Sequence, residues 1–383
     1  MIAEWVGALS LGVWIYLVFA RGGFWKMRIE DLPAGGSALP IHRVAVVVPA
    51  RDEAPVIAQA VQSLLHQDYT GVLRIYVVDD HSSDDTAEIA RVAAESAGRS
   101  DELVVIQADP LAAGWTGKLW ALAQGVQAAT AFSPDYYWFT DADITHDPHN
   151  LANLLAKAES ADLDMVSLLV KLRCKSLAER MLIPAFVFFF FKLYPPAWVA
   201  SPKKRTAAAA GGCILIRPAA LAKVGGIAAI RNQLIDDCAL ARAVKRQGGR
   251  IWLGHTSKAR SLRAYRSFRA VGSMIARSAF TQLHHSAALL CAVIFAMTVT
   301  YLAPVLLLGT GRHWAAVLGL SAWVLMTIAY WPTVRLYRLS ALWALFLPMA
   351  ALFYLGATML SALQFWTGQG GVWKGRVQDL ANG

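Results

Sequence analysis

The chain has 383 residues, of which 56% are hydrophobic and only 16% are charged. This composition excludes an ordinary soluble enzyme unless the apolar residues are confined to part of the chain. They concentrate over 2–20 and 286–364, while the middle carries nearly all the acidic residues and most of the turn signals. The sequence therefore predicts one soluble domain with membrane attachments at both ends.

The net charge of +10 fits either a nucleic acid or a membrane surface as partner. The membrane is favoured, and nucleic acid is not expected, because many basic residues lie close to the hydrophobic segments. They are Arg21, Lys26, Arg28, Lys258, Arg260, Arg263, Arg266, Arg269 and Arg277. The four cysteines form no CxxC pair, which indicates neither a disulfide framework nor a zinc site and fits a reducing cytosol.

Residues 1–22 are predicted to form a transmembrane anchor. The apolar run carries only Glu4 as a charge and is followed by three basic residues, Arg21, Lys26 and Arg28. By the positive-inside rule, the following domain lies in the cytoplasm. A cleaved signal peptide is the alternative, but no basic region precedes the run and no clear small-residue cleavage site follows it.

Residues 42–280 are predicted to be the cytoplasmic catalytic domain, joined to the anchor by a Pro/Gly linker over 32–40. Apolar runs predict strands at 44–48, 73–78, 103–106 and 136–140, separated by helical patterns that include 119–129 and 150–160. Strands that alternate with helices predict an α/β fold with a mostly parallel sheet. Ligands of such sheets bind at the carboxyl ends of the strands.

The remaining hydrophobic segments divide into a central one and a C-terminal group. The segment 181–200 is interpreted as interfacial or as a buried core helix, because a crossing there would separate acids that we assign to one site. Three possible spans follow at 286–309, 314–332 and 340–363, although one of them can be a re-entrant hairpin. Simple counting puts the tail 365–383 outside, against the basic residues Lys374 and Arg376. We expect a multi-pass protein of the inner (plasma) membrane.

Two polar stretches follow the first two predicted strands and are candidate nucleotide sites. The first contains Pro49, Arg51 and Glu53, and the second contains Asp80. Carboxylates at strand ends accept hydrogen bonds from a nucleobase or a ribose. Asp84, further along the second stretch, is instead expected to support the start of the helix near Thr86.

The stretch Gly114–Lys118 delivers a lysine at the start of a helix. It is not a P-loop, because Ala112 stands where glycine is needed and Leu119 where serine or threonine is needed. No G-x-G-x-x-G fingerprint is present in the sequence. A lysine and free N–H groups at a helix N-terminus nevertheless suit a phosphate group.

Two acidic pairs complete the candidate site. Asp141 and Asp143 follow a predicted strand, and two such carboxylates can hold Mg²⁺ or Mn²⁺ while a diphosphate fills the remaining positions; the alternative is a polar turn. Asp236 and Asp237 open a helix, where the alternative is capping. The functional interpretation makes one of them the general base for an acceptor hydroxyl.

In this order, PARDE, VVDDHSSDDT, TGK, DAD and IDDCALARAVKRQGG resemble the inverting family 2 glycosyltransferases with the GT-A fold, over roughly 42–255. The chain looks closest to the hopanoid-biosynthesis-associated members, with the ceramide glucosyltransferases more distant. The resemblance implies that Pro49, Arg51, Glu53 and Asp80 hold a nucleotide, with uridine favoured. It assigns Asp141 and Asp143 to the metal and diphosphate, Asp237 to the catalytic base beside Asp236, and the acceptor side to 211–213 and 225–226.

Two departures from that family matter. Asp52-Glu53 replaces its usual Asn-Glu, and its Gln-x-x-Arg-Trp motif is absent, the nearest stretch being 274–278. The second departure indicates a non-processive enzyme, in which Arg277 can still meet the leaving diphosphate. The predicted reaction moves a sugar from a nucleotide diphosphate-sugar to a lipid acceptor. A metal-dependent nucleotidyltransferase and a non-catalytic subunit of a membrane lipid-synthesis complex are the alternatives.

Overall fold

The computed structural model describes residues 1–27, 40–368, 372–373 and 376–377. The chain forms two compact units. The helical unit comprises 1–27, 173–197 and 264–371, and the sheet unit comprises the rest. The linker predicted over 32–40, apart from Pro40, and most of the tail over 365–383 lie outside the described residues.

The sheet unit is built on eight strands in the order β3-β2-β1-β4-β7-β6-β8-β5. The first four strands in this order are mutually parallel, whereas β7 is antiparallel to both of its neighbours and β5 is antiparallel to β8. The strands are β1 (Arg43–Ala50), β2 (Val72–Asp79), β3 (Leu103–Gln107), β4 (Tyr136–Phe139), β5 (Ile144–His146), β6 (Met165–Lys171), β7 (Ile214–Ile216) and β8 (Ile251–Ser261).

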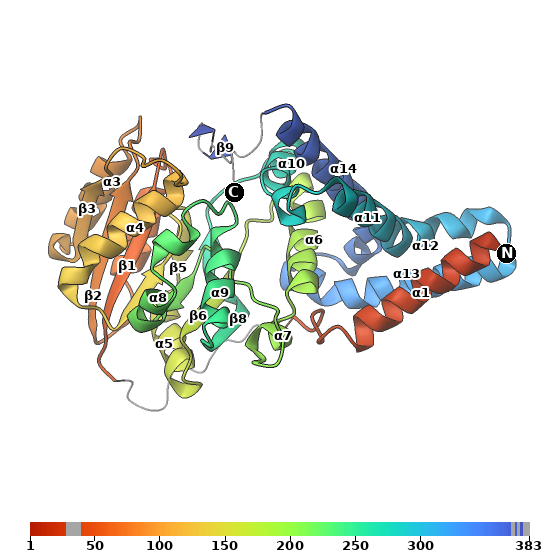
Figure 1. Ribbon diagram of the computed structural model, residues 1–383, viewed down its shortest axis with the longest axis horizontal. Helices are drawn as coiled ribbons and strands as arrows, with labels where there is room; N and C mark the ends of the chain where they lie inside the picture. The colour runs from red at the N-terminus through yellow and green to blue at the C-terminus, as the bar shows by residue number, and fades with distance from the viewer. Residues whose placement is uncertain (28–39, 369–371, 374–375, 378–383) are drawn as a thin grey trace. The chain divides into compact units, whose positions relative to one another are not determined.

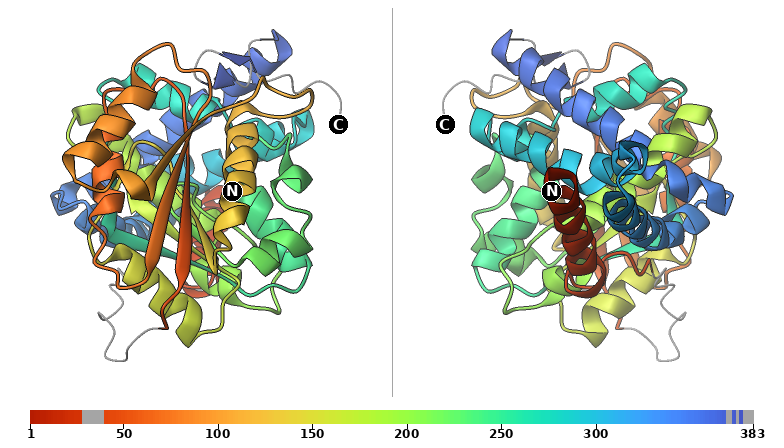
Figure 2. Two further views of the ribbon diagram at one scale, coloured as in Figure 1. Left: turned by 90° about the vertical axis from the view of Figure 1, so that its left-hand side faces the viewer. Right: turned by 90° about the vertical axis from the view of Figure 1, so that its right-hand side faces the viewer.

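Helices join and flank these strands, as Figure 1 and the left view of Figure 2 show. They are α2 (Ile57–Leu65), α3 (Thr86–Ser96), α4 (Gly117–Ala129), α5 (Asn150–Ser160), α8 (Pro218–Lys223) and α9 (Asp236–Arg246). Every residue of β1 after Arg43 is buried, as its unbroken apolar run predicts for a strand covered on both faces. Helix α4 approaches this strand closely, because Gly125 faces Val47 and Val78.

The four strands predicted from apolar runs are confirmed, and so is the mostly parallel sheet. The sequence did not indicate β5, β6, β7 or β8. Two of these are short, since β5 and β7 have three residues each, and the pairing of β6 with β8 contains a bulge between Leu169 and Lys171. The antiparallel β7 makes the sheet mixed rather than purely parallel.

The helical unit contains long apolar helices, and five segments of the described chain are long and apolar enough to cross a membrane: Ile2–Phe19, Leu177–Ala200, Ala287–Thr310, His313–Leu336 and Ala341–Trp366. They correspond to α1 (Ile2–Phe19), α6 (Leu177–Leu193) with α7 (Pro196–Ala200), α11 (Ala287–Met297) with α12 (Ala303–Leu306), α13 (His313–Leu336) and α14 (Leu347–Trp366). The short helix α10 (Phe268–Ala276) precedes α11.

Helices α1 and α13 lie side by side and run in the same direction (Figures 1 and 2). Near their starts, Arg312 pairs with Glu4 at 3.4 Å. A Cβ on Gly7 would lie only 2.9 Å from Cβ of Leu318, so glycine permits this close contact. The indole of Trp14 donates to the carbonyl of Thr300 at 2.7 Å, which fastens α1 to the π-helical turn after α11.

The segment after α13 folds back along that helix. A 3₁₀ helix over Ala341–Phe346 returns beside α13, where the indole of Trp323 donates to the carbonyl of Leu345 at 3.3 Å. Since Trp323 lies near the middle of α13, the chain has turned back by half the length of that helix. Helix α14 then ends beside the start of α11, where Ala362 packs with Leu290 and Phe280. The chain after α13 therefore forms a hairpin that turns back at half the length of that helix.

The segment 181–200 belongs to helix α6 and the short α7. A capping box of Ser176 and Glu179 starts α6, and the buried carboxylate of Glu179 also accepts from Arg173 at 2.7 Å and from the N–H of Tyr265 at 2.7 Å. Strands β6 and β7, which precede and follow the segment, pair in one sheet. One crossing of a bilayer would put these two strands on opposite sides, so their pairing excludes it.

Candidate active site

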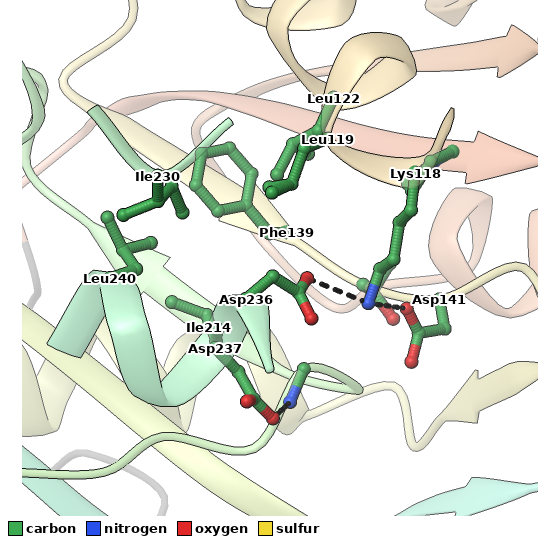
Figure 3. A pocket seen from close by; sticks show the side chains of 13 residues that line it. Lys118, Leu119, Leu122, Phe139, Asp141, Ile214, Ile230, Asp236, Asp237 and Leu240 are labelled. Carbon is green, nitrogen blue, oxygen red and sulfur yellow. Dashed lines mark hydrogen bonds and ion pairs between the residues drawn. The ribbon is translucent and has the colours of Figure 1, made fainter. Parts of the chain in front are cut away.

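A pocket lies at the carboxyl ends of β1 and β4 in the sheet unit, and Figure 3 shows its two different walls. One wall is apolar and includes Leu119, Phe139 and Leu240. The other carries charge: Lys118, Asp141, Asp236 and Asp237. Residues from four separate predicted motifs therefore meet here, because Pro49 also lines the pocket.

Lys118 stands between two of the acids. Its Nζ lies 2.9 Å from Oδ1 of Asp141 and 3.1 Å from Oδ2 of Asp236, as the dashed lines in Figure 3 mark. Burial alone would lower the pKa of Lys118, but the two carboxylates outweigh it and hold the pKa above its usual range. The lysine therefore stays charged and joins the start of α4 to the start of α9.

Asp237 is held by two backbone N–H groups. Its Oδ2 accepts from Gly211 at 2.9 Å and its Oδ1 from Cys238 at 2.7 Å. Burial and the neighbouring charge of Asp236 nevertheless raise the pKa of Asp237 to about 6, against the opposing effect of Lys118 and of these hydrogen bonds. The N-cap of α9 is Ile235, which makes no side-chain cap bond. Asp237 is thus oriented toward the Gly211 loop.

Asp143 and Glu53 are bridged by one guanidinium. Nε of Arg263 lies 2.8 Å from Oδ2 of Asp143, and its Nη2 lies 2.6 Å from Oε1 of Glu53. The position of Arg263 near the hydrophobic segments predicts a contact with lipid headgroups. The structure corrects that interpretation, since a contact across 210 positions along the chain commits this side chain to two acids of the site.

The loops after β1 and β2 are bonded to each other. Ser83 donates its N–H to Asp52 at 2.7 Å, and Ala54 donates to Asp84 at 3.1 Å. Asp84 also accepts from the N–H of Thr86, the first residue of α3, as expected of a residue that supports the helix start. Asp80 is fully buried, with Oδ2 3.7 Å from Nη1 of Arg51. These loops form a fixed edge beside Pro49.

Three interactions that the motifs did not predict hold the pocket together. Thr140, which precedes Asp141, donates its hydroxyl to the carbonyl of Gly212 at 2.9 Å and lies 2.9 Å from Nε2 of His146. Asn150 lies 3.1 Å from the other ring nitrogen. Burial lowers the pKa of His146 to about 3, so the ring is neutral and can donate through Nε2 to Thr140. His146 and Asn150 lie in a mostly polar stretch of the sequence, where no local pattern distinguishes them.

Arg277, Gly225 and Gly226 are not among the residues that line the pocket. Arg277 follows α10 in the helical unit, so its role at the diphosphate stays a prediction. Gly225 and Gly226 have φ of 89° and 71° and form the turn after α8, which only glycine adopts readily. Neither glycine lines the pocket.

The acids fit a divalent metal only in company with a diphosphate. Within the described ranges, no group of three His, Cys, Asp or Glu side chains is placed to hold an ion. Mg²⁺ is ordinarily bound by one or two carboxylates together with substrate phosphates. Asp141, with 35% of its side chain exposed beside Lys118, and Asp143 supply two such carboxylates.

Comparison with known proteins places this fold in a class. The mannosyltransferase PcManGT from Pyrobaculum calidifontis, in complex with GDP-Man and Mn²⁺, superimposes with a TM-score of 0.56 at 18% identity, over 94% of this chain and 98% of that one. The fold is therefore that of a glycosyltransferase structure. The model of the family described as "Glycosyltransferase like family 2" matches residues 42–271. The chain belongs to that family, and it is a glycosyltransferase.

A curated relative is also similar in sequence. The N-acetylglucosaminyltransferase of Rhizobium leguminosarum bv. viciae is 31% identical over 157 residues. These residues make up 40% of this chain and 35% of the relative, so the chain matches about a third of that protein's length.

Proposed function

We propose that the enzyme moves a sugar from a nucleotide diphosphate-sugar, with UDP-sugars favoured, to a hydroxyl of a lipid acceptor. The observation that carries the proposal is the pocket in which Asp237, Lys118 and Asp141 meet. A displacement at the anomeric carbon requires a positive charge that stabilises the anionic leaving group and a group that accepts a proton. Lys118 can supply the first and Asp237 the second. Two similar proteins, by name an N-acetylglucosaminyltransferase and a mannosyltransferase with GDP-Man, support a nucleotide-sugar donor.

In this mechanism Asp237 accepts the proton of the acceptor hydroxyl. The hydroxyl oxygen attacks the anomeric carbon, the bond to the diphosphate oxygen breaks, and its electron pair leaves with the nucleoside diphosphate in a single inversion. Lys118, at the start of α4, is suited to the phosphate charge that develops. A divalent ion held by Asp141 and Asp143 would neutralise part of the same charge. Pro49, Arg51, Glu53 and Asp80 would orient the nucleotide.

Charge distribution supports a membrane partner. The helical unit has twelve Lys or Arg residues but only two acids, Glu4 and Glu179, so its excess of positive charge equals the +10 of the whole chain. Large apolar side chains on its helices are also exposed. Trp5, Phe19, Phe295, Leu306 and Trp314 are each at least 65% exposed. Exposed apolar helices flanked by cations are typical of membrane proteins.

A lipid acceptor follows from this membrane setting. We propose that α1, α11 with α12, and α13 cross the bilayer, with the sheet unit in the cytoplasm and α6 at the interface. A site in such a domain would work beside the headgroup layer, where the hydroxyl of a lipid is available. A hopanoid as acceptor rests on the resemblance of the motifs alone.

The test is transfer by the full-length protein in membranes, supplied with Mn²⁺ or Mg²⁺, labelled UDP-sugars and extracted host lipids. We expect a labelled lipid and free nucleoside diphosphate. Asp237→Asn should lower the rate by about 10²–10⁴-fold, as loss of a general base does. Pyrophosphate with a nucleotide-linked product would instead identify a nucleotidyltransferase. Nucleotide binding without any turnover would favour a non-catalytic subunit.

A further inference from the structure

Arg263 reaches the site through a rigid backbone. Strand β8 pairs with β5 so that Ser261 is opposite Ile144, and the N–H of Leu262 donates to the carbonyl of Asp143 at 2.8 Å. The N–H of Arg263 itself lies 3.3 Å from the hydroxyl of Ser261. The position from which the side chain starts is therefore fixed, next to Asp143.

The guanidinium end of Arg263 is less confined than its backbone. Its side chain is 37% exposed, whereas the side chains of Asp143 and Glu53 are each only 12% exposed. An arginine fork can bond two carboxylates at once, and this one does so with distances of 2.8 Å and 2.6 Å. Two acids that would repel each other are thereby held in place.

The same contact conflicts with a divalent ion. Oδ2 of Asp143 already accepts from Arg263 and lies 3.3 Å from the hydroxyl of Ser261. An ion bound by Asp143 would place two positive charges beside the guanidinium, and like charges at such a distance repel strongly where water is scarce. Either the ion binds poorly or Arg263 leaves Asp143. A diphosphate provides the anion to which the released guanidinium can turn.

We propose that Arg263 is a positioning residue that competes with the divalent ion for Asp143 and turns to the donor diphosphate when both ligands are present. This inference rests on the proposed donor site. It predicts that the ion and the nucleoside diphosphate bind with positive coupling. The ion displaces Arg263 from Asp143 and so frees the guanidinium for the diphosphate. The diphosphate in turn draws the guanidinium away from Asp143 and so removes the repulsion that the ion would meet. Arg263 is the residue that produces the coupling.

Mn²⁺ binding measured by electron paramagnetic resonance tests this without any turnover. The full-length protein in detergent is titrated with Mn²⁺ alone and with UDP, and in parallel with GDP. For the wild type we expect weak binding that tightens about tenfold or more with one nucleotide, within the usual range of coupling between two sites. Arg263→Gln should bind Mn²⁺ alone more tightly and lose most of the tightening. Arg263→Lys, which keeps the charge without the fork, should fall between them.

Arg260→Gln is the matched control, because Arg260 lies on β8, three positions before Arg263, and the side chain of Arg260 bonds only the carbonyl of Ser257 among the contacts described for it. It should behave as the wild type. If Arg263→Gln binds Mn²⁺ alone as the wild type does, or less tightly, with its circular dichroism unchanged, the competition is refuted while the donor site stands. If the wild type binds no Mn²⁺ with either nucleotide, both the donor site and this inference are wrong.

Discussion

At the scale of residues, the site contains three charged side chains that interact with one another. Asp236 and Asp237 are adjacent acids, and Lys118 lies 3.1 Å from the first of them. Burial and the like charge of Asp236 raise the pKa of Asp237, while Lys118 opposes the rise. A base with a pKa near the pH at which it works transfers protons well.

The pH dependence of transfer should report these charges. As the proposed base, Asp237 must be ionised to accept a proton, and its pKa is raised to about 6, so the rate should fall about tenfold per pH unit below that value. Asp236→Asn removes the like charge and should move the acid limb to lower pH. Lys118→Met removes the opposing cation and should move the limb to higher pH. An acid limb that stays in place in both variants would contradict the role of Asp237.

Asp237 should also lower the stability of the fold at neutral pH. The folded-state pKa of this carboxyl lies above its unfolded value, so the protonated form stabilises the fold relative to the ionised form. This contribution to the free energy of unfolding is lost as pH rises through the raised pKa. Asp237→Asn should therefore raise the melting temperature at pH 7.5 and have little effect at pH 4. Thermal unfolding at the two pH values measures this and also shows that the inactive variant is folded.

At the scale of elements, helix α4 carries Lys118 and rests on β1 through a glycine. A Cβ on Gly125 would lie 2.3 Å from Cγ1 of Val47 and 2.9 Å from Cγ2 of Val78. The distance between this helix and the strand therefore depends on the absence of a side chain. Moving α4 outward would shift Lys118 relative to Asp141 and Asp236.

A double-mutant cycle tests that contact. Gly125→Ala should destabilise the protein by about 1–3 kcal/mol, the usual effect of overpacking, despite the better helix propensity of alanine. Val47→Ala in the same chain should recover part of the loss, because it removes the nearest atom. Denaturant unfolding in detergent gives the free energies. Additive effects of the two substitutions would show that Gly125 and Val47 do not meet.

With the proposed membrane topology, the hairpin after α13 is re-entrant, which makes a prediction about sides of the membrane. In a variant without the native cysteines, Thr367→Cys should react with an impermeant thiol reagent from the same side as Leu339→Cys, in the loop after α13. Gly309→Cys, near the Glu4 end of α1, should react from the opposite side. The hairpin brings the chain back to the side of the membrane from which it left. If the segment after α13 crossed the membrane fully, Thr367 would lie on the same side as Gly309. Labelling of right-side-out and inverted vesicles separates the two arrangements.

At the scale of the whole molecule, net charge is divided between the two units. The sheet unit is neutral by sequence, and the helical unit carries the whole excess. Several of its cations are exposed, including Lys175, Arg180, Arg266 and Arg269. A basic residue near an anionic surface gains about 1 kcal/mol, and salt screens the gain.

Lipid composition should therefore affect stability. In nanodiscs, the melting temperature should be higher with anionic than with zwitterionic lipid, and the difference should shrink as salt is raised from 50 to ~500 mM. The double variant Arg266→Gln/Arg269→Gln should reduce the difference. Arg250→Gln, an exposed arginine of the sheet unit, is the matched control and should not. Equal melting temperatures in the two lipids would contradict a role of these cations at the membrane.

The sequence by itself determined the elements whose signal is local. The run 44–48 predicts a buried strand, because an unbroken apolar stretch rich in β-branched residues suits a strand covered on both faces. Asp141 could be placed at the end of a strand and Asp236 at the start of a helix from the neighbouring residues alone. Rules about strand ends then brought four motifs to one edge of the sheet. Each of these patterns depends only on residues that are near one another in the sequence.

Only the tertiary structure decided which distant residues meet. Nothing near Arg263 in the sequence indicates that it bridges Asp143 and Glu53 rather than facing a lipid, and nothing in the apolar stretch after α13 distinguishes a full span from a hairpin. Thr140 and Gly212 are likewise 72 positions apart. Composition and periodicity indicate how much of an element is buried, but they do not identify the residues that it contacts. Contacts between distant residues are set by the packing of the whole chain.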